Sequence, residues 1–231
     1  MRLVLWDIDG TLVNTAGHGR AAFMQAFETV LGRAPELDDV PMAGRTDHAI
    51  CVDLLERNGV GDAARLLTPM FAALERALLA RREQMTAQGS AQPGVREALT
   101  ALGGRDGVLQ SVLTGNIEPN AEMKLAAFGL DSLIDLRIGG YGSDHGTRSE
   151  LVRVAREKTR ARHAVDVPAS ATVVVGDTPL DVDAGRAAGA RTVAVATGPY
   201  TVEELSQAAP DAILEDVCDL DALLSALDLA A

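Results

Sequence analysis

Short apolar runs alternate along the chain with longer segments whose apolar residues recur at helical spacing. Each run ends at glycine or polar residues, which is typical of a buried strand. The predicted strands are 3–6, 109–113, 172–175 and 192–196, with a weaker candidate at 134–138, and the predicted helices are 93–103, 119–129, 149–163 and 181–188. Strands that alternate with helices of this length predict a parallel sheet with helices on both faces.

One long stretch interrupts this alternation, between the first predicted strand and the helix that begins at Pro93. Its apolar residues follow helical spacing, and glycines punctuate it. A parallel crossover needs one helix and not several, so the stretch holds more helix than the sheet requires. We therefore predict an inserted helical domain at 16–88, within a core domain made of 1–15 and 89–231.

Composition narrows the classes of partner. The 231 residues include 33 acids and 21 bases, which gives a formal net charge of -12. Binding to nucleic acid or to an anionic membrane surface depends on basic side chains, so we expect neither partner. Cys51 and Cys218 are too few for a disulfide scaffold, and the apolar run before Asp7 is too short for a signal peptide. We expect a cytoplasmic monomer or homodimer.

Three of the predicted strands end in small polar or acidic residues. These ends are Asp7-Ile8-Asp9-Gly10-Thr11, Thr114-Gly115-Asn116 and Gly176-Asp177-Thr178-Pro179-Leu180-Asp181. Ligands of open parallel sheets bind at the carboxyl ends of the strands, so the clusters converge if these strands are neighbours. Several carboxylates at one spot need a cation, and oxygen ligands of this kind suit Mg²⁺.

These strand ends resemble three motifs of the haloacid dehalogenase-like (HAD) hydrolase superfamily in order, spacing and strand context. The first motif corresponds to Asp7-x-Asp9-Gly10-Thr11, the second to Thr114-Gly115-Asn116 and the fourth to Gly176-Asp177-x-x-x-Asp181. The resemblance is greatest to the phosphoglycolate phosphatase-like and β-phosphoglucomutase-like branch. It implies an α/β fold, a Rossmann-like parallel sheet core with helices on both faces, and an inserted helical cap domain of the C1 type.

The resemblance implies a Mg²⁺-dependent phosphomonoester hydrolase that acts on a small phosphorylated metabolite. Asp7 would attack phosphorus and form an aspartyl-phosphate. Asp9 would be the general acid for the leaving oxygen and then the base for water. Mg²⁺ would be held by the Asp7 carboxylate, the Asp9 backbone carbonyl and Asp177. Asp181 would hold a metal-bound water or orient its neighbours.

Phosphate contacts are implied for the second motif and for the end of the first. Thr114 and the backbone amide of Asn116 would hold phosphate oxygens. Gly10 and Gly115 let the backbone approach an anion closely, and Thr11 is grouped with these substrate-binding residues.

The chain departs from the family at the third motif, a lysine at the start of the helix before the fourth motif. The two lysines, Lys124 and Lys158, stand elsewhere. Arg148 stands at the start of the predicted helix before the fourth motif, where the family has its lysine. We hypothesise that Arg148 neutralises the nucleophile and the phosphate. In the cap, Arg45 is expected either to bind a second anionic group of the substrate or to be a solvated arginine beside a helix N-cap at Thr46.

Two other functions remain open from the sequence. A sugar-phosphate mutase of the β-phosphoglucomutase type would transfer the phosphoryl group to a second hydroxyl instead of to water. A non-catalytic binding protein on the same fold is less favoured, because Asp7 and Asp9 are both present.

Overall fold

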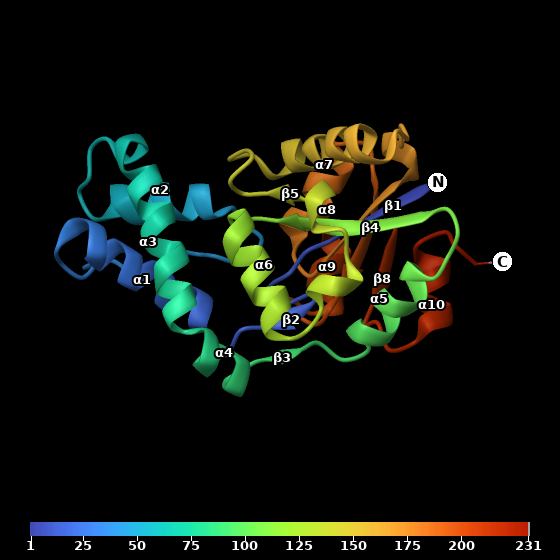
Figure 1. Ribbon diagram of the computed structural model, residues 1–231, viewed down its shortest axis with the longest axis horizontal. Helices are drawn as coiled ribbons and strands as arrows, with labels where there is room; N and C mark the ends of the chain where they lie inside the picture. The colour runs from blue at the N-terminus through green and yellow to red at the C-terminus, as the bar shows by residue number, and fades with distance from the viewer. Residues whose placement is uncertain (231) are drawn as a thin grey trace.

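A parallel sheet in the strand order β5-β4-β1-β6-β7-β8 forms the centre of the larger lobe (Figure 1). The computed structural model describes residues 1–230. The strands are β1 (Arg2–Trp6), β4 (Val108–Thr114), β5 (Gly140–Tyr141), β6 (Thr172–Gly176), β7 (Arg191–Val195) and β8 (Ala212–Leu214). The predicted α/β class is therefore confirmed.

Helices cover both faces of this sheet, as expected for a parallel sheet. They are α5 (Val95–Gly103), α6 (Glu118–Ala127), α7 (Arg148–His163), α8 (Pro179–Ala187), α9 (Val202–Gln207) and α10 (Leu220–Ala226), with a 3₁₀ turn η4 (Ala169–Ala171). Side chains of β1 alternate between the faces. Val4 and Trp6 pack in one cluster with α5, α6 and α10, whereas Leu3 and Leu5 pack in another with α7.

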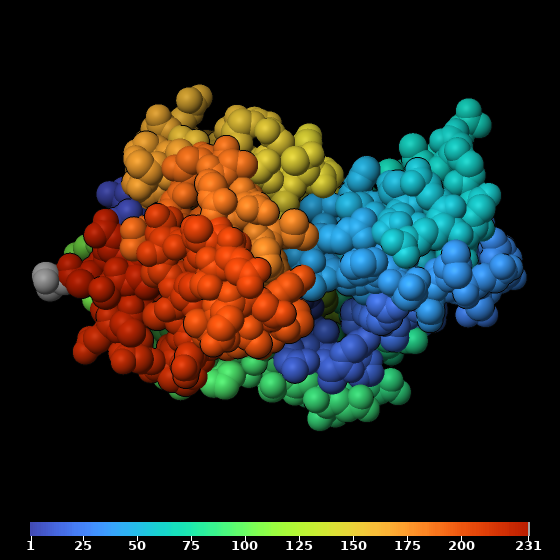
Figure 2. Space-filling model, turned by 180° about the vertical axis from the view of Figure 1, so that it is seen from behind, coloured from blue at the N-terminus to red at the C-terminus, as the bar shows by residue number. Residues whose placement is uncertain are grey.

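The smaller lobe consists of helices only, and we refer to it as the helical cap. Its elements are α1 (His18–Leu31), α2 (Asp47–Arg57), the 3₁₀ turn η1 (Ala63–Leu66), α3 (Leu67–Ala80) and α4 (Arg82–Gln88). The cap has its own apolar core, in which Phe27, Leu54 and Met70 are fully buried. Ile117, just before α6, belongs to the same cluster, so the cap packs against α6. Figure 2 shows the two lobes in contact from behind.

Two short antiparallel strands join the lobes. They are β2 (Val13–Asn14) and β3 (Ser90–Ala91), and Val13 pairs with Ala91. The chain leaves the sheet and returns to it at this one place, so both crossings run side by side. Strands of two residues carry too little periodicity to be recognised in the sequence.

The prediction of a strand at 134–138 is wrong. The chain there forms two 3₁₀ turns, η2 (Asp131–Leu133) and η3 (Leu136–Ile138), and the edge strand is β5. Both isoleucines of the run are buried, but the Asp135 carboxylate accepts a hydrogen bond from the Arg137 backbone and turns the chain. Periodicity alone does not assign so short an apolar run.

Two further expectations concern the whole chain. Among residues 1–230 no helix is both long and apolar enough to cross a membrane. Cys51 is buried, Cys218 is exposed, and both are free thiols. The cysteines are therefore not part of a disulfide scaffold.

Candidate active site

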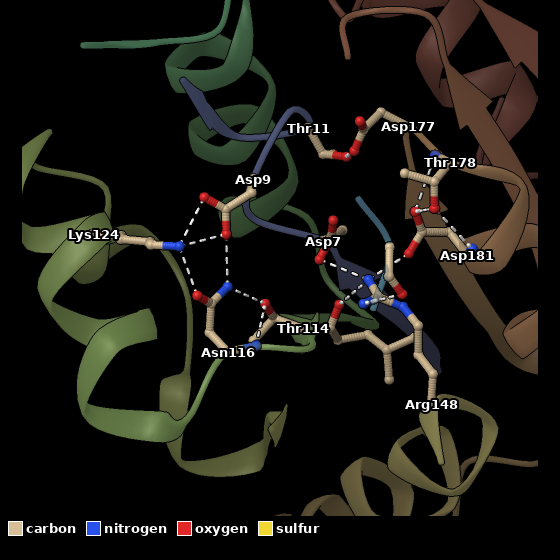
Figure 3. A network of polar contacts seen from close by, with 12 residues as sticks. Asp7, Asp9, Thr11, Thr114, Asn116, Lys124, Arg148, Asp177, Thr178 and Asp181 are labelled. Carbon is tan, nitrogen blue, oxygen red and sulfur yellow. Dashed lines mark hydrogen bonds and ion pairs between the residues drawn. The ribbon is translucent and has the colours of Figure 1, made fainter. Parts of the chain in front are cut away.

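The three strands that end in polar motifs are neighbours in the sheet, in the order β4-β1-β6. Their carboxyl ends bring Asp7, Asp9, Thr114 and Asp177 to one edge (Figure 3). A cavity of about 250 Å³ lies between this edge and the cap, with Asp7, Asp9 and Thr114 in its wall. The convergence expected from the strand ends is therefore present.

Arg148 begins α7, and its buried guanidinium contacts Asp7. Nη2 lies 2.7 Å from Asp7 Oδ1 and 2.5 Å from Asp181 Oδ1, and it also donates to the Leu113 carbonyl. Nη1 donates to the Gly44 carbonyl of the cap over 3.2 Å. Burial disfavours the charge, but the two carboxylates outweigh it and raise the pKa of Arg148. We call Arg148, Asp7 and Asp181 the Arg148 cluster.

Three buried carboxylates lie together at the floor of the site. Oxygen atoms of Asp7, Asp177 and Asp181 all lie within 4.8 Å of one another. Burial raises the pKa of Asp7 to about 7 and that of Asp177 to about 8, and neighbouring carboxylates add to both shifts. Arg148 opposes the shift of Asp7 without abolishing it. The negative charge of these three carboxylates is only partly balanced by Arg148. A group of oxygen ligands with excess negative charge suits a divalent cation such as Mg²⁺.

Two glycines and a threonine enclose the Asp177 carboxylate. Gly10 has a φ of +89°, and a Cβ there would lie 2.3 Å from Asp177 Oδ2. A Cβ at Gly198 would lie 1.7 Å from the same oxygen, and the Thr11 hydroxyl donates to Oδ1 over 2.8 Å. Gly10 and Thr11 thus make room for, and bind, a carboxylate of the site. Their contact with the substrate stays a prediction.

Asp181 is held by the start of its own helix. Its Oδ2 accepts hydrogen bonds from the Thr178 hydroxyl at 2.7 Å and from the Thr178 amide at 3.1 Å, which forms a capping box. Its Oδ1 accepts from Arg148. Both oxygens are therefore engaged, which suits the orienting role expected for Asp181 better than direct contact with a metal.

The Asp9 carboxylate turns away from the other three and pairs with Lys124. The Lys124 Nζ lies 2.8 and 2.6 Å from the two Asp9 oxygens and 2.6 Å from Asn116 Oδ1. We call Lys124, Asp9 and Asn116 the Lys124 cluster. From the sequence Lys124 had no assigned role, because it does not stand at the start of the helix before the fourth motif. A signal was present, because helical spacing puts this lysine on the buried stripe of α6 beside Ala121 and Leu125.

The second motif faces both the cavity and the cap. The Asn116 backbone amide donates to Thr114 Oγ1 over 3.2 Å, so the two expected phosphate ligands lie next to each other. A Cβ at Gly115 would lie 2.0 Å from the Arg45 carbonyl oxygen, and the Gly115 carbonyl accepts from the Asp47 amide over 2.7 Å. The small residue here admits the cap loop.

Asp47 closes the cap over the core. Its Oδ2 accepts from the Ile117 amide over 2.8 Å. Burial raises the pKa of Asp47 to about 7, while the nearby Lys124 acts in the opposite direction and Asp9 adds to the shift. The neighbouring N-cap residue Thr46 also reaches the core, because its hydroxyl donates to the Gly146 carbonyl over 3.0 Å.

Arg45 forms part of the cavity wall, but its guanidinium is engaged within the cap. It donates to Asp53 over 2.8 Å and to the Pro41 and Ala49 carbonyls over 2.9 and 3.1 Å. The Asp53 carboxylate already balances its charge. An arginine with these contacts is not free to bind a second anion in this arrangement. Substrate binding by Arg45 stays a prediction.

Comparison with known proteins agrees with this geometry. The chain is 29% identical to the probable phosphatase IndB of Dickeya dadantii over 92% of this chain and 89% of the relative. It is 28% identical to the plasmid phosphoglycolate phosphatase of Cupriavidus necator over 98% of this chain and 94% of the relative. A hydrolase from Pseudomonas syringae has the same fold, with a TM-score of 0.72, 22% identity and full coverage of both chains.

One family model, described as haloacid dehalogenase-like hydrolase, matches the chain from β1 to α8 and includes the cap. It covers residues 4–186, which is most of the chain and includes every residue of the Arg148 and Lys124 clusters. The resemblance inferred from the strand-end motifs is thus confirmed. The chain belongs to the haloacid dehalogenase-like hydrolase family.

Proposed function

We propose that the protein is a Mg²⁺-dependent phosphomonoester hydrolase that works through an aspartyl-phosphate on Asp7. One observation carries the proposal: Asp7 follows β1 directly and lies in the cavity wall, paired with Arg148 and close to Asp177. Relatives named as phosphatases support the same reaction class. The general acid candidate Asp9 lies two residues further along the chain, in the same cavity.

In the first step, a carboxylate oxygen of Asp7 attacks phosphorus and the bond from phosphorus to the leaving oxygen breaks. Asp9 gives its proton to that oxygen, so the alcohol departs neutral. In the second step water attacks the aspartyl-phosphate, Asp9 takes a proton from the water, and inorganic phosphate leaves. Arg148 neutralises charge beside Asp7 in both steps.

The cavity edge offers hydrogen-bond donors for phosphate oxygens. Thr114 ends β4 and Asn116 follows it, and both line the cavity together with Asp7. The Thr114 hydroxyl hydrogen is free to donate, whereas the Asn116 backbone amide donates to Thr114 Oγ1. Phosphoryl transfer depends mainly on positioning and charge neutralisation, which such donors provide together with Arg148.

Asp7 and Asp177 are the side chains that would hold Mg²⁺, with the Asp9 backbone carbonyl as the third protein ligand. Asp181 would orient its neighbours. When bound, the ion supplies positive charge against the phosphate oxygens and the buried carboxylates. The raised pKa values of Asp7 and Asp177 support a cation at this place.

The substrate is a small phosphorylated metabolite in this proposal. The cavity of about 250 Å³ is smaller than the roughly 300–1,000 Å³ that drug-sized ligands occupy. We further propose that residues 16–88 act as a cap domain that encloses the substrate, because Asp47 and Thr46 tie the cap to the core. A cytoplasmic location and a monomer or homodimer remain our expectation.

The test is release of inorganic phosphate by the purified protein from p-nitrophenyl phosphate and from a panel of phosphorylated metabolites, with Mg²⁺ supplied. We expect hydrolysis of at least one substrate, and loss of about 10⁴-fold or more in the Asp7→Asn variant. The matched control is Asp183→Asn, an exposed acid of α8.

Two results would contradict the proposal. One is the absence of phosphate release from every substrate. The other is conversion of a sugar phosphate into its isomer without phosphate release, which would identify a mutase instead.

A further inference from the structure

The ammonium group of Lys124 has three hydrogens, and three acceptor oxygens surround it. Its side chain is 5% exposed, whereas that of its partner Asp9 is 42% exposed. The Nζ hydrogens are taken up by both oxygens of Asp9 and by Asn116 Oδ1. An ammonium group has three hydrogens and no acceptor, so this lysine is fully engaged on the wall of the cavity.

The engagement of Lys124 decides which way the Asn116 amide faces. Because an ammonium group only donates, Asn116 must turn its oxygen to Lys124 and its NH₂ group to the other side. That NH₂ group donates to Asp9 Oδ2 over 2.8 Å and to Thr114 Oγ1 over 2.7 Å. Figure 3 shows the resulting chain of contacts from Lys124 to Thr114.

Thr114 is the end of this chain. Its hydroxyl oxygen accepts from the Asn116 side chain and from the Asn116 backbone amide. Both lone pairs of the oxygen are thereby used, so the hydroxyl hydrogen is the one left to donate. The two hydrogen bonds from Asn116 therefore leave the Thr114 hydroxyl as a donor, and a donor is what a phosphate oxygen requires.

An ordinary structural ion pair explains this arrangement less well. A buried ion pair that serves only the fold takes both of its charges out of water. Here the acid is the half-exposed carboxyl of the cavity, and the lysine contacts both of its oxygens. The cap helix α1 covers the amine, since a Cβ at Gly19 would lie only 3.7 Å from Nζ.

We propose that Lys124 is a positioning residue for the leaving-group side of the reaction. It fixes the Asp9 carboxyl where the leaving oxygen departs and, through Asn116, the direction of the Thr114 hydroxyl. This inference rests on the proposed phosphatase function.

The test compares two leaving groups in the Lys124→Met variant. p-Nitrophenolate departs without a proton, whereas the alcohol of an aliphatic phosphate monoester needs one from Asp9. We expect kcat/KM for the fastest aliphatic substrate of the panel to fall about 100-fold, and that for p-nitrophenyl phosphate to fall less than about tenfold. Lys124→Arg should recover part of the aliphatic activity, since a guanidinium reaches both oxygens of a carboxylate.

Two controls separate positioning from folding. Lys158→Met changes the other lysine, which lies on α7 and pairs with Asp144, and should leave both substrates unaffected. In an Asp9→Asn background, Lys124→Met should cost the aliphatic substrate less than about tenfold, as for p-nitrophenyl phosphate, because only the contact through Asn116 to Thr114 is then left to lose. Should Lys124→Met lower the melting temperature too far for assay, the double-variant comparison is repeated with Lys124→Gln.

Equal losses on both substrates, or additive losses in the Asp9→Asn background, would overturn the inference and leave the phosphatase function standing. A wild-type protein that cleaves neither substrate overturns both, and the assay of the wild type alone distinguishes that case.

Discussion

The Arg148 cluster and the Lys124 cluster both pair a cation with a carboxylate of the first motif, yet their surroundings differ. Arg148 and both its acid partners are nearly inaccessible, with side chains at most 8% exposed. Lys124 is equally buried, but the side chain of its partner Asp9 is 42% exposed. The first cluster contains a carboxylate with a raised pKa and lies against Asp177.

This difference matches the work proposed for each cluster. The proposed nucleophile Asp7 must stay in one place, and the buried Arg148 holds its carboxylate. The proposed proton-transfer group Asp9 has to reach the substrate. Its carboxyl is therefore partly exposed at the cavity, while its partner Lys124 is buried. In the proposed mechanism, the Arg148 cluster serves charge neutralisation and the Lys124 cluster serves proton transfer.

Removal of the divalent metal should lower activity more than any other change, and it concerns the carboxylates beside the Arg148 cluster. A chelator is expected to abolish phosphate release, and Mg²⁺ to restore it. Mg²⁺ at 100 times its Kd should also stabilise the fold by about 2.7 kcal/mol, visible as a higher melting temperature. Asp177→Asn should raise the Mg²⁺ concentration needed by about tenfold or more. Full activity in the chelator would refute a metal requirement.

Arg148→Ala should have the next largest effect. It leaves two buried carboxylates without their cation, so we expect kcat/KM to fall about 100- to 1,000-fold and the free energy of unfolding to fall by about 3 kcal/mol. Arg153→Ala changes an exposed arginine of the same helix, and as the control it should leave both turnover and stability close to those of the wild type. Near-normal turnover of a folded Arg148→Ala variant would contradict the role of Arg148 in neutralising the nucleophile and the phosphate.

Asp47 gives a pH-dependent prediction on the Lys124 side. Its pKa is about 7 in the folded protein against 3.8 ordinarily, so between pH 4 and 7 the folded state binds the extra proton. Stability should therefore decline as pH rises from about 4 to 7 and level off above. Asp47→Asn should flatten this decline and be at least about 1 kcal/mol more stable than wild type at pH 8. The measurement is thermal unfolding across pH.

Asp53 on the same helix supplies a control of opposite sign. Hydrogen bonds from Arg45 and Arg57 lower its pKa, so its contribution to stability is present at neutral pH and is lost as pH falls through the lowered value. Asp53→Asn should therefore destabilise at pH 7 and match wild type in acid. The same pH trend for both variants would contradict the burial argument for Asp47.

Arg45→Ala should have the smallest effect. Its guanidinium is bound to Asp53 and two carbonyls, so we expect less than about threefold change in KM and less than about 1 kcal/mol in stability. A tenfold rise in KM would instead restore the predicted contact between Arg45 and the substrate.

Sequence patterns were sufficient where a local rule applied. The strands at β1, β4, β6 and β7 followed from apolar runs, and the motif residues followed from what ended those runs. The edge strand was misplaced because the buried isoleucines before it belong to 3₁₀ turns. The helix predicted at 181–188 is present as α8, which begins two residues earlier, at Pro179.

Side-chain partners were decided by the tertiary structure, because they depend on which strands lie side by side. Lys124 and Asp9 are 115 positions apart and meet because β4 lies beside β1. Arg148 reaches Asp7 and Asp181 together because β1 and β6 are adjacent and α7 begins beside them. The sequence by itself thus determined the family, the fold class and the residues of the motifs. Only the packing of the sheet decided which cation serves which carboxylate, since strand order is not encoded in any local pattern.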